Sequence, residues 1–238
     1  MGQMMANRIQ RVRHELKRRE LEVVKVRHLA PNYVSVTFKG ETLHDFVSAS
    51  YDDHVKFLIS DEDRRDFTPR SYNNETCELV VEFALHATGA ASDWARQATP
   101  GQIAVFGGPR GSMIIPMDYA WHVLAGDATA LPAIRRRLEE LPADAKVQVL
   151  VSGEEAAALS FDSAAQVQLQ RYADSAALLA AIRALALPAG EGFFWFAGEA
   201  SVAAQVRDAV FVDKGHPREA ARISAYWKQG ASGHHEDL

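Results

Sequence analysis

The sequence predicts two units: an N-terminal antiparallel Greek-key β-barrel and a C-terminal α/β domain with a parallel sheet. Two patterns of residues along the chain support this prediction. Apolar and polar residues alternate in short runs up to about residue 116, and strand-like runs then alternate with alanine-rich helical runs. A length of 238 residues suits two domains. We expect them at residues 1–117 and 118–238.

The first half holds short strand-like runs separated by turn-forming residues. In Tyr33–Lys39 the apolar Val34, Val36 and Phe38 alternate with polar residues, which is typical of a half-buried strand. Similar runs occupy Leu21–Val26, His54–Ile59, Glu78–His86, Gln102–Phe106 and Met113–Ile115, with one helical run at Ala91–Gln97. Six or so strands with little helix between them predict an antiparallel barrel.

The second half alternates strands with helices. Strands are expected at Trp121–Ala125, Lys146–Val151, Val167–Gln170, Phe193–Ala197 and Ile223–Trp227, and helices at Leu131–Leu141, Ser175–Leu185 and Val202–Val210. This order predicts a parallel sheet covered on both faces. Ligands of such sheets bind at the carboxyl ends of the strands.

Composition excludes several classes of protein. The net charge of −5 argues against a nucleic-acid-binding protein, and no apolar run is long enough to cross a membrane. The single cysteine, Cys77, permits no internal disulfide and no cysteine-based zinc or iron–sulfur site. Residues 1–20 are polar and basic, unlike a secretory signal, so we expect a cytoplasmic protein.

Both ends of the chain are charged. The first 30 residues hold eight Lys or Arg against three Glu, which indicates either a solvated N-terminal helix or a positive rim for an anionic ligand. The histidines do not form a convincing metal site, and we expect the tail His234-His235-Glu236-Asp237 to be disordered.

Two motifs of the first half could bind a cofactor. In Arg65-Asp66-Phe67-Thr68-Pro69-Arg70, an aromatic ring, a hydroxyl donor and forked cations are the groups that a flavin needs. A charged edge strand with a core Phe is the alternative. In His86-Ala87-Thr88-Gly89-Ala90-Ala91-Ser92, a loop leads into a helix that we expect to begin near Ser92 as N-cap, which is either a pyrophosphate site or an ordinary capped helix.

The other glycine-containing segments do not match the dinucleotide-binding motif. Gly107-Gly108-Pro109-Arg110-Gly111-Ser112 is not G-x-G-x-x-G and precedes a strand, so we interpret it as a β-turn. Gly126-Asp127-Ala128-Thr129, with Thr129 a possible cap, and Gly198-Glu199 follow strands of the second half. Tyr226-Trp227-Lys228 ends the last strand, as a packed terminus or as the edge of a flavin site.

Taken together, these motifs resemble the siderophore-interacting proteins, the FAD-dependent ferric-siderophore or ferric-chelate reductases of bacteria. The resemblance runs from about Arg11 to Gly230. It also includes Arg11-Val12-Arg13, Asp53-His54-Val55-Lys56, Ala-Gly-Asp-x-Thr-Ala-Leu-Pro-Ala-Ile and Tyr-Trp-Lys. It implies a ferredoxin-reductase-like arrangement, with FAD between the two domains.

The resemblance also implies residue roles. Phe67 would lie against the isoalloxazine with Thr68 near its N5, and Thr68, Asp127 and Lys228 would be the catalytic residues. The FAD contacts would be Arg65, Asp66, Phe67, Thr68, Arg70, His86, Gly89, Ala91, Ser92, Trp94, Tyr226 and Trp227. The nicotinamide side would hold Asp127, Thr129, Gly198 and Glu199, with no metal ligand in the protein.

The implied reaction passes a hydride from NADH or NADPH to FAD, and then single electrons to ferric iron in a siderophore or another chelate. This chain departs from the family pattern at two places. The family usually has Tyr where this chain has Phe67. In addition, Glu154 and Glu155 follow the strand that meets the ribose of the donor. Acidic residues there favour NADH over NADPH unless Arg171 folds in. The alternatives are a flavin reductase fed by a protein electron donor, and a non-enzymatic carrier of ferric siderophores.

Overall fold

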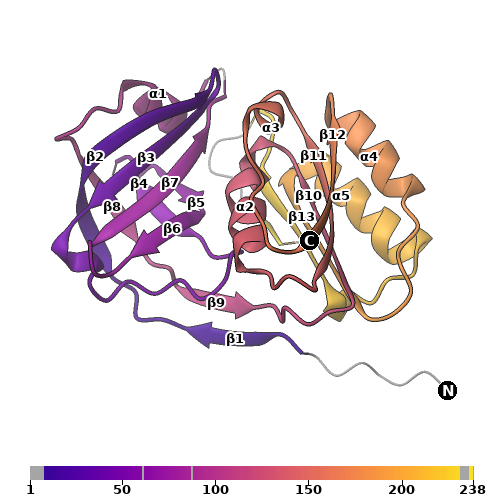
Figure 1. Ribbon diagram of the computed structural model, residues 1–238. Helices are drawn as coiled ribbons and strands as arrows, with labels where there is room; N and C mark the ends of the chain where they lie inside the picture. The colour runs from indigo at the N-terminus through magenta and orange to yellow at the C-terminus, as the bar shows by residue number, and fades with distance from the viewer. Residues whose placement is uncertain (1–7, 61, 87, 231–235, 238) are drawn as a thin grey trace.

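The computed structural model describes residues 8–60, 62–86, 88–230 and 236–237, and these form two main sheets that lie side by side (Figure 1). The first is a curled antiparallel sheet with the strand order β5-β4-β8-β2-β3-β7-β6. Its strands are β2 (Arg18–Ala30), β3 (Tyr33–Lys39), β4 (Val55–Leu58), β5 (Arg64–Phe67), β6 (Pro69–Asn73), β7 (Glu78–Ala84) and β8 (Ile103–Gly107). The predicted antiparallel barrel is thereby confirmed.

Alternation of apolar side chains builds the core of this sheet. Val34, Val36 and Phe38 of β3 are fully buried, as predicted, but the strand is not half-buried, because Tyr33 and Ser35 on its other face are buried as well. Val34, Val36 and Phe38 pack with aromatic residues of β4, β7 and β8 beneath the helix α1 (Ala90–Gln97). The turn after β8 leads directly into the strand β9 (Gly111–Ile114), as expected.

The second sheet is parallel over the five strands β12-β11-β10-β13-β14, with a short antiparallel strand β15 at its edge. The bounds are β10 (Trp121–Gly126), β11 (Lys146–Ser152), β12 (Gln166–Tyr172), β13 (Gly192–Glu199), β14 (Ala221–Trp227) and β15 (Glu236–Asp237). Strand order reverses at β10, which places a topological switch point there.

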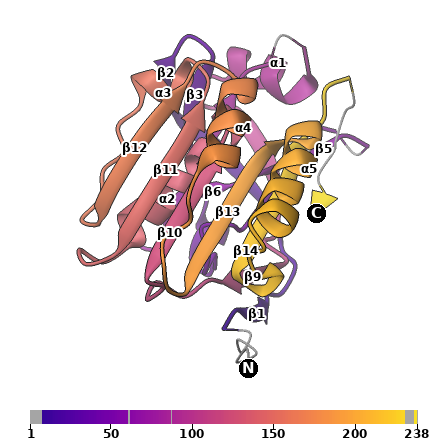
Figure 2. The ribbon, with the colours of Figure 1, turned by 90° about the vertical axis from the view of Figure 1, so that its right-hand side faces the viewer.

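Helices cover both faces of this sheet because β13 is apolar on both sides. Phe193 and Trp195 pack toward α2 (Leu131–Glu140), whereas Phe194 and Phe196 pack toward α4 (Ser175–Ala184) and α5 (Ala200–Asp208). Figure 2 shows α4 and α5 together on one face of the sheet. The short helix α3 (Glu155–Ala158) and the turns η2 (Ala128–Ala130), η3 (Ala209–Asp213) and η4 (Arg218–Ala220) complete the domain, and a further turn, η1 (Glu41–Leu43), lies in the first domain. No described helix is long and apolar enough to cross a bilayer.

Both predictions for the chain ends need correction. The basic N-terminal segment forms strands, not a helix: β1 (Gln10–Arg13) pairs with β9, and β2 alternates buried Leu21 and Val23 with exposed charges. The tail was expected to be disordered, but Glu236 and Asp237 pair with the open edge of β14 as β15. His234 and His235 lie outside the described residues.

Three consecutive arginines of α2 join the two sheets. The buried Arg136 guanidinium donates to Ser48 Oγ and Ser48 O, both at 2.8 Å, and to Pro69 O at 3.0 Å. Arg137 donates to the carbonyls of Ile115 and Pro116, and Arg135 to the Glu82 carboxylate. These contacts fix the position of the β5–β6 corner relative to the second sheet.

Candidate functional site

A cleft of about 920 Å³ lies between the curled sheet and the carboxyl ends of β10 and β14. Its volume is at the upper end of ordinary ligand sites. The predicted site residues that line it are Arg65, Asp66, Phe67, Thr68, His86, Gly89, Ala91, Ser92, Thr129, Tyr226, Trp227 and Lys228. The predicted residues that do not line it are Arg70, Trp94, Asp127, Gly198 and Glu199.

The wall on the barrel side presents an aromatic ring and a cation. Phe67 lies at the end of β5, where its ring is 4.4 Å from that of Phe83, centroid to centroid. Arg65, two residues earlier, forms an ion pair with Asp63. Thr68 is only 6% exposed, and its hydroxyl forms a hydrogen bond with that of Tyr226 across the cleft.

The first turn of α1 faces the cleft with its backbone. The helix begins at Ala90 after Gly89, which has φ 141° and leaves the helix without a side-chain cap. Ser92 is therefore not the predicted N-cap, because its Oγ accepts the His86 N–H at 3.0 Å instead. Uncapped N–H groups of a first turn suit an anionic phosphate.

An indole closes the far side of the cleft. The ring of Trp227, at the end of β14, lies 4.8 Å from the His86 ring, centroid to centroid. Its Nε1 donates to Asp127 Oδ2 at 2.9 Å. Burial raises the pKa of the neighbouring Tyr226 well above its ordinary value, so its hydroxyl stays protonated.

Asp127 lies behind the cleft, where donors of the protein surround its carboxylate. Oδ1 accepts the backbone N–H of Thr129 at 2.9 Å and its hydroxyl at 2.6 Å, so Asp127 and not Thr129 caps the turn η2. Oδ2 also accepts the Glu199 N–H at 3.0 Å. A Cβ on Gly198 would lie 2.8 Å from this oxygen, which explains the glycine.

Glu199 caps α5 and does not face the cleft. Its carboxylate accepts the backbone N–H groups of Ser201 and Val202, and that of Gln229 just after β14. Burial alone would raise the pKa of Glu199, but these hydrogen bonds lower it below its ordinary value. The group therefore stays ionised and ties the ends of β13 and β14 together.

Two residues that were predicted to contact the cofactor do not line the cleft, because their side chains bind or pack against other residues of the protein. The Arg70 guanidinium is buried in the domain interface, where it pairs with Glu139 of α2. Trp94 packs in the barrel core against Phe38, Phe57 and Phe83.

Sequence reasoning missed Glu82, which lines the cleft although only 5% of it is exposed. Arg135 Nη1 donates to both of its carboxylate oxygens, and the Tyr33 hydroxyl donates to Oε2. A single acidic residue within the apolar run of β7 was the signal that could have revealed it.

The mouth of the cleft carries excess positive charge. Lys56 pairs with Asp66 at 2.7 Å, while Arg64 and Lys228 form no ion pair with any residue in the described part of the chain. Together with the uncapped turn of α1 and the aromatic Phe67, this donor set fits FAD, whose pyrophosphate is anionic and whose ring system is planar. Within the described residues, no cluster of His, Cys, Asp or Glu could hold a metal ion.

Comparison with known proteins matches the two halves of the chain to two domains of the same kind of protein. The model of the siderophore-interacting FAD-binding domain matches residues 22–65 and 62–113, and that of the siderophore-interacting protein matches residues 119–230. The NADPH-dependent ferric-chelate reductase of Escherichia coli is 31% identical over 92% of this chain and 96% of its own.

Two solved structures share the whole fold. A siderophore utilization protein from T. fusca superposes with a TM-score of 0.85 at 29% identity, covering 95% of this chain and 98% of that one. The siderophore-interacting protein SipS from Aeromonas hydrophila superposes with a TM-score of 0.78 at 26% identity, covering 93% and 94%. The chain belongs to the siderophore-interacting protein family.

Proposed function

We propose that this protein is an FAD-dependent reductase that takes electrons from NADPH and delivers them to ferric iron held in a siderophore or another chelate. The observation that carries the proposal is the cleft, where Phe67, Arg65 and the uncapped first turn of α1 converge. The similarity to the siderophore-interacting FAD-binding domain and to the NADPH-dependent ferric-chelate reductase of E. coli supports the same activity.

The barrel side of the cleft would hold the cofactor. Phe67 would pack against the isoalloxazine, and Thr68, oriented by Tyr226, would lie near its N5. Arg65 and the N–H groups from Gly89 onward would bind the pyrophosphate. Bound FAD supplies the chemistry that no side chain has: it accepts a hydride and returns single electrons.

The nicotinamide donor would enter at the carboxyl ends of β10 and β13. Thr129 lines the cleft there, and the Asp127 carboxylate behind it fixes its backbone and hydroxyl. Arg171, at the end of β12, donates its Nε–H to Ala156 O in α3, directly beside the acidic turn that follows β11. A guanidinium at this edge suits the 2′-phosphate of NADPH despite Glu154.

The positive mouth would attract the anionic ferric chelate. Lys228, Lys56 and Arg64 line it from both sides. Siderophores hold iron through hard oxygen donors, which bind ferrous iron far more weakly, so reduction would release the metal without any protein ligand. We further propose that residues 1–117 form the FAD-binding domain, that residues 118–238 form the donor-binding domain, and that the protein acts in the cytoplasm, where nicotinamide cofactors are available.

An iron-release assay tests this function. Purified protein with FAD, NADPH and a ferric chelate should produce ferrous iron, measured with a ferrous-specific dye, and NADH should support a lower rate. R171S should raise the KM for NADPH by about tenfold or more, since a phosphate loses a charge-assisted partner, and leave the KM for NADH nearly unchanged. R207S, which changes an exposed arginine of α5, is the matched control.

Each alternative has its own outcome in this assay. If chemically reduced protein releases iron but neither nucleotide does, the donor is a protein. If the protein binds ferric siderophore but shows no FAD-dependent reduction with any donor, it is a carrier and the proposal fails.

A further inference from the structure

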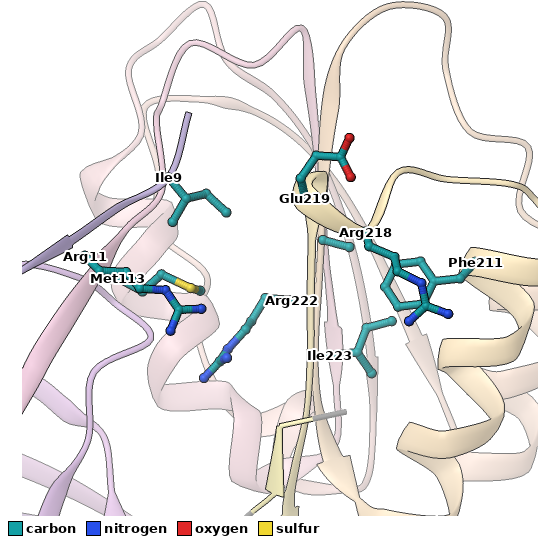
Figure 3. Close-up of a pocket in the computed structure, with 9 residues that line it drawn as sticks. Ile9, Arg11, Met113, Phe211, Arg218, Glu219, Arg222 and Ile223 are labelled. Atoms are coloured by element: carbon teal, nitrogen blue, oxygen red, sulfur yellow. The ribbon is translucent and has the colours of Figure 1, made fainter. Parts of the chain in front are cut away.

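Asp52 and Glu82 are buried carboxylates of the domain interface, and each is paired with an arginine. The partner of Asp52 is Arg222, which lines a small cavity of about 180 Å³ at the start of β14 and does not line the cleft (Figure 3). The partner of Glu82 is Arg135, and Glu82 itself lines the cleft. Of these two carboxylates, Glu82 is therefore the one that faces a molecule bound in the cleft.

Side chains from three elements fix the Glu82 carboxylate. Arg135 Nη1 donates to Oε1 at 2.7 Å and to Oε2 at 3.0 Å, and the Tyr33 hydroxyl donates to Oε2 at 3.1 Å. Arg135 is held in turn by a hydrogen bond from its Nε–H to Ser160 O, at 2.9 Å. Arg70 Nε lies 3.8 Å from Glu82 Oε1. Neither arginine nor Tyr33 lines the cleft, so Glu82 is the member of this cluster whose charge faces the cleft.

Glu82 lies beside the part of the cleft that we assign to the isoalloxazine. The strand β6 begins directly after Thr68, and its first residue pairs with β7 next to Glu82. Asp66 is the other carboxylate among the described residues that line the cleft. Its partner Lys56, at 2.7 Å, lines the cleft as well and balances its charge there. The cations that balance Glu82 lie behind the wall of the cleft, so its negative charge is not offset on the cleft side.

We propose that the charge of Glu82 lowers the reduction potential of FAD bound in this cleft, an inference that rests on the function proposed above. Accepting a hydride brings FAD two electrons and one proton, so reduction leaves one further negative charge on the ring system. A fixed carboxylate in a poorly solvated wall opposes that charge. The two electrons then pass singly to two ferric ions, with release of the proton. A lower potential makes this transfer more favourable for iron that hard oxygen donors hold in the ferric state.

Anaerobic redox titration of the full chain with bound FAD, against a dye of known potential, tests this role. E82Q should raise the equilibrium constant for two-electron reduction by about tenfold or more, which is a rise of about 30 mV in midpoint potential. Glutamine has the shape of glutamate, and its amide oxygen still accepts from Arg135. E82D keeps the charge but is shorter, and its equilibrium constant should stay within about threefold of the wild type. A role in packing alone predicts the reverse order of the two variants.

E78Q is the matched control. Glu78 lies on the same strand and the same face as Glu82, about 13 Å away along β7, and it does not line the cleft. Its substitution removes an equal charge from the same element, so the equilibrium constant should change by no more than about twofold.

The outcomes separate this role from the proposed function. If E82Q loses its fold or its FAD, the variant E82Q/R135Q takes its place, because it removes both charges and leaves no unpaired member of the pair. It should also raise the potential, since Glu82 and not Arg135 lines the cleft. An unchanged potential, or an equal shift in E82D, would overturn the role of Glu82 and leave the reductase standing. A wild-type chain that binds no FAD would overturn the proposed function and this role together.

Discussion

The indole of Trp227 is hydrogen-bonded to the carboxylate of Asp127, with 2.9 Å between Nε1 and Oδ2. This bond joins the end of the last long strand to the end of the first strand of the same sheet. Because the Trp227 ring also packs, tilted by 35°, against the His86 ring of the barrel side, the three residues form a continuous wall between the two domains. The geometry of the cleft therefore depends on Asp127, although Asp127 does not itself line it.

Removal of the Trp227 hydrogen bond should weaken FAD binding. W227F keeps an aromatic ring beside His86 but loses the donor to Asp127, so the dissociation constant for FAD should rise by about fivefold, the value of one net hydrogen bond. Titration followed by flavin fluorescence measures it. W121F loses a comparable indole bond, to Gly190 O, at the other end of β10, and should leave FAD affinity unchanged. Equal effects of both variants would contradict a specific role for Trp227.

Asp127 should prove to be a positioning residue. In D127N, an amide NH2 group replaces one of the two carboxylate oxygens of Asp127. In place of Oδ1 it would face the donors of Thr129, and in place of Oδ2 it would face the donors of Glu199 and Trp227. The free energy of unfolding should fall by about 2–3 kcal/mol, and the Tm by about 5–10 °C. Activity per bound flavin should change little. A direct role in proton transfer predicts the reverse: an unchanged Tm and a loss of about 100-fold in kcat.

Substitution at Phe67 separates ring stacking from hydrogen bonding. F67Y adds a hydroxyl to the same ring, and its FAD affinity should stay within about threefold of the wild type because the aromatic surface is kept. F67S should weaken FAD binding by more than about tenfold, since stacking and apolar burial are both lost. Equilibrium dialysis of FAD measures both variants. Tight binding by F67S would place the isoalloxazine elsewhere.

Arg136 should couple the stability of the domain interface to the flavin site. R136K cannot reproduce the fork that reaches Ser48 and Pro69, so buried carbonyls lose their donors, and unfolding should become easier by about 2–4 kcal/mol. FAD affinity should fall as well, because Pro69 directly follows Thr68. Denaturant unfolding and FAD titration test both effects, with R207K as control. A stability loss without any change in FAD affinity would refute the coupling.

Acid should destabilise the protein through a buried histidine of strand β10, in the second sheet. Burial lowers the pKa of His122 from 6.5 to about 4, so the folded state disfavours the proton that the unfolded chain accepts. The stabilisation is fully present above pH 6.5 and is lost as the pH falls toward 4, a loss of about 3 kcal/mol. Burial lowers the pKa of His216 as well, which acts in the same direction.

Unfolding of wild type and H122N at pH 7 and pH 4 measures this contribution. The loss in free energy of unfolding between pH 7 and pH 4 should be smaller in H122N than in the wild type, by most of the contribution given above for His122. An unchanged difference would assign the acid sensitivity to other groups.

Local patterns predicted most of the fold because strands of the first sheet such as β2 and β8 alternate, and each of the strands β10 to β13 of the second sheet is followed by a helix or helical turn. The N-terminal helix was the main error. The alternating run Leu21–Val26 was predicted as a strand, but β2 begins earlier, at Arg18, and β1 depends on its pairing with β9, which is distant in sequence. β15 could not be predicted either, because it depends on the free edge of β14, a feature of tertiary structure.

For the site, the sequence predicted which segments reach the cleft better than it predicted which side chains line it. Phe67, Thr68 and Trp227 line the cleft as expected. Arg70 and Trp94 come from the same segments but turn into the interface and the core, because Glu139 and three barrel aromatics hold them. Such partners are distant in sequence, so no local pattern could reveal them.

We propose above that this cleft binds FAD and that the protein passes electrons from NADPH to a ferric chelate. The most direct test is the visible absorbance of the FAD-saturated protein under anaerobic conditions. We predict that NADPH bleaches the flavin band and that a ferric chelate then restores it, with ferrous iron formed. If the protein shows no flavin band after incubation with FAD and removal of the excess, the cleft does not bind FAD and the proposed reductase activity is wrong.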